Sequence, residues 1–179
     1  MRARTRKLLL ILIATLVLAL PASAPSMIEA DRYGLHIQVK PLGYNEVVSL
    51  YLGRGLEGPV IERYARHCVL RVRLRNVDSK ARISTAMDEW VVRTSGQSPR
   101  RIQGRSHWIA EIDRSQPSQE ARMVFEWSQL PEVIGLDAGD SVQGLVSLPL
   151  QRGIEFELVI HWRSGGRSFE KSIRRIDCS

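Results

Sequence analysis

Cysteine is scarce in this chain of 179 residues, and no Cys-x-x-Cys pair occurs. The two cysteines, Cys68 and Cys178, therefore lack the spacing of a dithiol redox motif. In an oxidising compartment two such thiols pair by default. We expect a Cys68–Cys178 disulfide that ties down the C-terminus, with a redox or metal-binding thiol as the alternative.

Apolar runs long enough to cross a membrane are lacking as well. The run at 8–20 has 13 residues, whereas a spanning helix needs roughly 20. It follows a basic start and ends in Pro-Ala-Ser-Ala, which is the layout of a secretory signal peptide. We predict a signal peptide at 1–24 and a single domain at 25–179 that is periplasmic or secreted and has no stable membrane span. The alternative is an uncleaved anchor.

Lysine is rare, because only four of the 26 basic residues are lysines. Removal of the signal peptide takes away four basic side chains and lowers the formal net charge from +7 to +3. So small a net charge does not indicate a nucleic-acid-binding protein. We therefore expect no nucleic-acid partner.

Apolar and polar residues alternate through much of the chain, as in CVLRVRLRN at 68–76. A period of two is typical of strands with one buried face, and Ser-Gly-Gly-Arg at 164–167 predicts a hairpin turn. Trp127 and Trp162 fall on apolar faces and are expected in the core; a carbohydrate platform of tryptophans is the alternative. Seven to nine short strands predict an all-β, antiparallel β-sandwich. They are expected at 34–40, 68–76, 81–86, 89–93, 106–112, 122–127, 141–150, 155–163 and 168–177.

Residues 44–67 do not alternate and instead predict a helical insert of two short helices. We expect Asn45 to cap the first helix, glycines at 53 and 55 to end it, and Pro59 to open the second. Such an insert would cover one end of the sandwich.

Gly-Asp-Ser at 139–141 precedes the nucleophile in several hydrolase families. A lipase-type serine lies between a strand and a helix, and a chymotrypsin-type serine is followed by glycine, where this chain has Val142. Turn-forming residues at 137–140 instead lead into a strand that begins at Ser141. We interpret the motif as a turn and expect no catalytic residues and no enzyme.

A strand ending in asparagine (70–76) and the later GDSVQGLVSLP (139–149) resemble exported immunoglobulin-like domains of bacterial envelope proteins. In that family a Gly–acid–Ser/Thr turn introduces a strand that ends before a proline. The likeness covers roughly 80 residues, and leucine stands where phenylalanine is usual. The resemblance implies an immunoglobulin-like sandwich and an interaction role without catalytic residues.

The four histidines are not paired at a spacing typical of metal ligands, and we expect no metal or cofactor. A sandwich can nevertheless bring remote histidines together. The alternative function is therefore a periplasmic metal-handling protein that uses some of His36, His67, His107 and His161.

Arginines gather in the helical insert, beside Tyr51 and Tyr64, and in the polar segment 91–108. These residue types are enriched in protein interfaces, and arginine clusters bind phosphates or carboxylates; ordinary solvated surface is the alternative. We predict an exported, non-enzymatic domain that binds a protein or another envelope component. Its candidate interaction surface consists of Tyr51, Arg54, Arg63, Tyr64, Arg100, Arg101 and Arg105.

Overall fold

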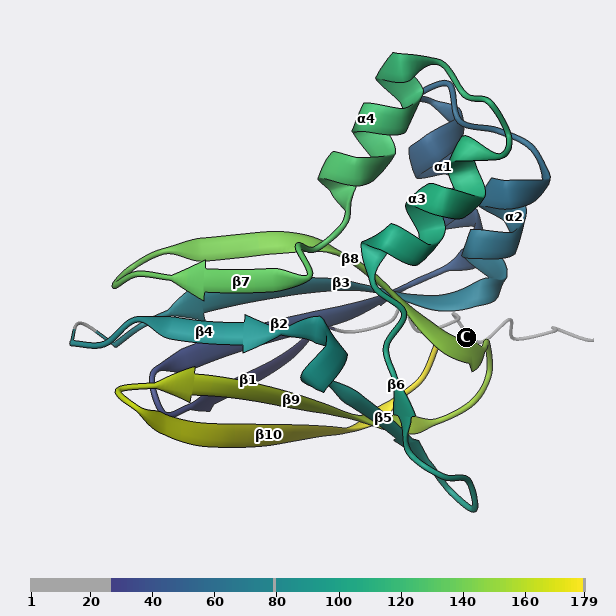
Figure 1. Ribbon diagram of the computed structural model, residues 1–179. Coiled ribbons are helices and arrows are strands. Elements are labelled where there is room, and N and C mark those ends of the chain that lie inside the picture. The colour runs from purple at the N-terminus through teal and green to yellow at the C-terminus, as the bar shows by residue number, and fades with distance from the viewer. Residues whose placement is uncertain (1–26, 79, 179) are drawn as a thin grey trace, which may run out of the picture.

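The computed structural model describes residues 27–78 and 80–178, which form two packed antiparallel sheets with four helices at one end (Figure 1). The signal peptide predicted at 1–24 lies outside the described residues. Among the helices of the described ranges, none is long and apolar enough to cross a membrane.

The first sheet, sheet A, has four strands in the order β1-β2-β3-β8, and all its pairs are antiparallel. Its strands are β1 (Ile28–Arg32), β2 (Leu35–Leu42), β3 (His67–Asn76) and β8 (Ser141–Gln151). The alternation at 68–76 and 141–150 predicted two strands, and the structure shows that they are neighbours in one sheet.

The second sheet, sheet B, is built around β9 (Phe156–Ser164). β10 (Arg167–Ile176) pairs with one edge of β9, and β4 (Ile83–Ala86) and β5 (Val91–Thr94) share the other edge. A single 3₁₀ turn, Met87–Glu89, separates β4 from β5. The sheet is completed by β7 (Val133–Leu136) beside β4 and β6 (Arg100–Arg101) beside β5.

One hydrophobic core lies between the two sheets, as the alternation predicts. The side chains of Leu70, Val72 and Leu74 from β3 are buried there with Leu158 and Trp162 from β9. The predicted β-sandwich is therefore confirmed, and so is the core position of Trp162.

Both predicted turns are present. Gly165 and Gly166 join β9 to β10 with φ angles of +56° and +74°, the backbone that a two-residue hairpin requires and that glycine adopts without a steric penalty. In the turn before β8, the Asp140 amide donates to the Asp137 carbonyl at 3.0 Å. Ser141 follows as the first residue of β8, paired with Arg75.

The helical insert is confirmed as α1 (Tyr44–Leu52) and α2 (Pro59–Arg66). Pro59 opens α2 as predicted, where its missing N–H costs nothing. The expectation that Asn45 caps α1 is wrong, because Gly43 occupies the N-cap and no side chain caps that helix. The insert lies over one end of sheet A (Figure 1).

Two predicted strands are helices instead: 106–112 lies in α3 (Arg105–Asp113) and 122–127 lies in α4 (Gln119–Ser128). The Ser118 side chain caps α4 by accepting from the Ala121 amide at 3.2 Å. Ala121 and Phe125, four residues apart, form the buried face of α4. Trp127 therefore points away and is 76% exposed, so its predicted core position is wrong.

Candidate functional site

A groove of about 530 Å³ lies where the helical insert meets the ends of both sheets. Four segments line it: α2, the start of β3, the β5–β6 hairpin, and the end of β8 with the turn that follows. Its described lining side chains include no carboxylate, and they are Arg63, Arg66, His67, Gln97, Arg100, Pro149, Leu150, Gln151 and Ile154. The groove therefore joins arginines from the two regions that the sequence analysis singled out.

The end of α2 places three of these side chains together. α2 ends at Arg66, and the extended backbone of His67 begins β3 without a connecting loop. Arg63 and Arg66 are exposed and three residues apart, so they lie on neighbouring turns of one helix face. Cys68 follows directly and is buried in the disulfide with Cys178, whose Cα lies 5.4 Å away. The predicted disulfide is confirmed.

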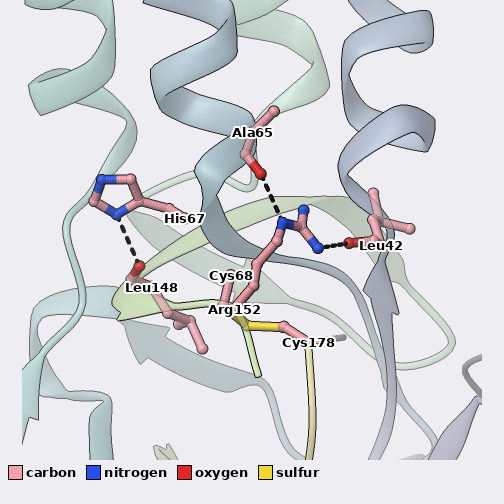
Figure 2. The surroundings of a disulfide bond; sticks show 7 residues. All are labelled: Leu42, Ala65, His67, Cys68, Leu148, Arg152 and Cys178. Carbon is pink, nitrogen blue, oxygen red and sulfur yellow. Dashed lines mark hydrogen bonds between the residues drawn. A yellow bond between two sulfur atoms is a disulfide. The ribbon is translucent and has the colours of Figure 1, made fainter. Parts of the chain in front are cut away.

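Successive carbonyls of β8 hold His67 and Arg100. His67 Nδ1 lies 3.2 Å from the Leu148 carbonyl oxygen (Figure 2), and Arg100 Nη1 donates to the Pro149 carbonyl at 3.0 Å. Neighbouring carbonyls in a strand point to opposite edges. His67 and Arg100 therefore flank the end of β8 from its two sides.

The positive charge of the groove is only partly neutralised. Arg63 lies 3.4 Å from Glu111 of α3, and Arg66 lies 3.4 Å from Glu62 one turn earlier in α2. Arg100 instead donates only to neutral oxygens. These are the Pro149 carbonyl and, at 2.8 Å, the Gln97 side-chain amide oxygen. Among the described residues its guanidinium is thus oriented without a countercharge, which is the arrangement that favours an incoming anion.

Arg152 stabilises the segments around the groove by linking them to one another. Its guanidinium donates to the carbonyls of Ala65 in α2 and Leu42 in β2, both at 2.8 Å (Figure 2). Burial lowers the pKa of Arg152 below its usual value, although an arginine remains charged at neutral pH. The side chain ties the turn after β8 to the end of α2 and to the start of the insert.

Replacing Arg152 by methionine is expected to lower the free energy of unfolding by about 1–3 kcal/mol, because two hydrogen bonds from a charged donor are lost. Arg73→Met is the matched control, since Arg73 is exposed on β3 and should change stability by less than about 0.5 kcal/mol. Urea unfolding measures both variants. Equal stabilities would contradict the stabilising role of Arg152.

Tyr51 and Tyr64 do not belong to an exposed surface, so this part of the predicted interaction surface is wrong. Both side chains are fully buried between the insert and α4. Gln129 donates to Tyr51 Oη at 2.7 Å and accepts from Tyr64 Oη at 3.0 Å. Burial raises the pKa of Tyr51 to about 12 and that of Tyr64 well above its usual value. Their helical spacing, read together with the apolar residues around them, could have indicated this.

The remaining predicted residues are divided between the groove and other places. Arg63 and Arg100 line the groove, whereas Arg54 bonds to the Leu50 carbonyl at the end of α1. Arg101, next to Arg100 in β6, lines a separate cavity beside Glu89, and Arg105 begins α3. The predicted surface is therefore not one continuous patch.

The histidines do not form a shared site. His36 lies 2.7 Å from Asp31, and His161 lies 3.7 Å from Glu170. His67 and His107 both contact the buried Trp108, with ring centroids 5.1 and 5.3 Å from it. Within the described ranges, no three His, Cys, Asp or Glu side chains are grouped so that they could hold a metal ion.

Sequence reasoning missed several residues of the groove. His67 was considered only as a metal ligand, and Gln97, Gln151 and Ile154 carried no signal at all. They meet because β3 pairs with β8 and the β5–β6 hairpin lies beside the end of β8, contacts between segments far apart in the chain.

The chain matches no protein-family model, and comparisons with curated proteins and with solved structures find no match either. The function therefore has to be inferred from the groove itself.

Proposed function

We propose that this protein is an exported, non-catalytic binding domain with an immunoglobulin-like sandwich. Its groove binds an anionic group on a partner protein or another component of the bacterial envelope. The single observation that carries the proposal is an open groove with three arginines and a histidine and no carboxylate among its described lining residues.

The strand pairing supports an immunoglobulin-like sandwich. In such domains the second and fifth strands, B and E, pair in one sheet, while C, F and G form the other. Here β3 pairs with β8 in sheet A, and β9 lies between β10 and β4/β5 in sheet B. This arrangement matches B with E, and F with G and C.

The disulfide supports export. Disulfides persist in secreted and periplasmic proteins and are rare in the cytosol. The Cys68–Cys178 bond agrees with the secretory signal peptide that the sequence predicts.

The groove suits binding better than catalysis. Its arginines are fixed by carbonyl, amide and carboxylate oxygens, and its described lining holds no serine, cysteine or carboxylate that could act as a nucleophile. The one residue there that could act as a base, His67, has no such nucleophile beside it in that lining and holds the Leu148 carbonyl through Nδ1. What the arrangement offers is oriented positive charge beside an apolar floor. Such a surface can hold an anion without transforming it.

Inorganic tripolyphosphate is the probe that tests anion binding, measured by isothermal titration calorimetry. Arg100→Glu should weaken binding at least about tenfold, because it removes an oriented cation and adds a repelling charge; tenfold corresponds to about 1.4 kcal/mol. Arg101→Glu is the matched control, since it makes the same charge change on the adjacent residue outside the groove. Equal losses in both variants would mean that only net charge matters, and the proposal would fail.

A further inference from the structure

The groove is much larger than a single anionic group requires. Its volume of about 530 Å³ lies within the range of sites that bind ligands of many atoms. Its described arginines come from two elements, α2 and β6, and each forms its hydrogen bonds with a different partner. A ligand that satisfied all of them would carry several separated negative charges.

The less exposed part of the lining, its floor, is apolar, and the two amides are more exposed. Leu150 is buried and Ile154 and Pro149 are half-buried, while Gln97 and Gln151 are exposed. Apolar atoms can accept an aliphatic side chain, and amides can both donate to and accept from a peptide backbone. The arginines, the apolar floor and the amides together suit a polypeptide: its acidic side chains can pair with the arginines, its apolar side chains can pack on the floor, and its backbone can bond to the amides.

A sugar ligand is less well matched. Sugar rings pack against aromatic faces, and apart from the His67 imidazole the described lining has no aromatic ring. Trp90, Trp108 and Trp162 are buried, and the exposed Trp127 belongs to α4, outside the groove. The tryptophans therefore do not form a carbohydrate platform here.

We infer that the groove binds an extended acidic segment of a partner protein. Carboxylates of that segment pair with Arg100 on one side of the end of β8 and with Arg63 and Arg66 on the other. A small apolar side chain between them packs on Leu150 and Ile154. This inference rests on the proposed function and specifies its partner.

Fluorescein-labelled glycine–serine peptides test the inference. Each contains glutamates separated by zero, one or two residues, and leucine as its apolar residue. Fluorescence anisotropy gives their affinities for the purified exported domain. At least one peptide should bind about tenfold more tightly than its glutamine counterpart. That preference should be lost in Arg100→Gln and kept in Arg101→Gln.

The apolar floor has its own test. Ile154→Ala should weaken binding of the leucine-containing peptide severalfold and leave unchanged the binding of a peptide with glycine in place of leucine. A floor that plays no part in recognition would give equal effects on the two peptides, which would overturn this part of the inference.

Two further measurements separate this inference from the proposed function. If tripolyphosphate binds in an Arg100-dependent way but no acidic peptide outperforms its glutamine counterpart, the peptide inference fails and the anion-binding function stands. Sedimentation with phosphatidylglycerol vesicles in the absence of peptide binding would point to lipid headgroups and would also overturn the inference. Failure of all three probes would remove both proposals.

Discussion

Replacing Cys68 and Cys178 together by serine is expected to lower the free energy of unfolding by about 4–5 kcal/mol. The bond joins residues 110 positions apart, and closing so long a loop removes much conformational entropy from the unfolded chain. In a domain of this size, the loss corresponds to a decrease in Tm of roughly 10–15 °C. Differential scanning calorimetry under non-reducing conditions measures it.

Reduction of the wild-type protein provides the control for this prediction. With a strong reductant present, wild type and the double serine variant should unfold at nearly the same temperature, because both then lack the bond. Equal Tm values under oxidising conditions would show that the bond adds nothing to stability. The loss should also loosen the turn after β8, since the Cys178 carbonyl accepts from the Gly153 amide at 3.2 Å.

The sandwich could be read from the sequence because much of its long strand β3 has one buried and one exposed face. In β3 the arginines at 71, 73 and 75 alternate with buried Leu70, Val72 and Leu74, and a helix would place these arginines on both sides of its axis. The hairpin of β9 and β10 was marked by two consecutive glycines. Local patterns sufficed wherever one strand face meets the core and the other meets solvent.

α4 shows where local patterns were insufficient. Arg-Met-Val-Phe-Glu-Trp can alternate as a strand, but it also places Phe125 four residues after Ala121 on one helix face. Six residues do not separate a period of 2 from a period of 3.6. The capping residue Ser118 was the local signal that could have decided for a helix.

The groove could not be predicted because no local pattern encodes it. Arg63 and Arg100 were chosen for their composition, and only the tertiary fold brings both to the end of β8. The same reason explains the wrong assignment of Tyr51 and Tyr64. Tyrosines beside arginines suggest an interface, yet their hydroxyls are satisfied by Gln129 and Ser128 from across the fold, and this allows complete burial.

A short connection after α4 holds this helix close to sheet A. Residues 129–130 leave α4 and run beside β8, where the Leu130 amide donates to the Leu145 carbonyl at 2.9 Å. Gly144 lies directly below this segment. A Cβ atom there would lie 2.6 Å from Leu130 Cα and 2.7 Å from the Gln129 carbonyl carbon, so the close approach requires glycine.

Gly144→Ala is therefore expected to lower the free energy of unfolding by about 2–4 kcal/mol, because the atoms in the way belong to the backbone and cannot rotate aside. Gly53→Ala is the matched control. Gly53 has a φ of −65°, and its added Cβ would meet only the Ser49 carbonyl at 3.6 Å, so the control should be neutral or stabilising by up to about 1 kcal/mol. Urea unfolding of both variants measures the difference. If Gly144→Ala were as stable as Gly53→Ala, the connection would be free to lift from β8, and α4 would not be held close to sheet A.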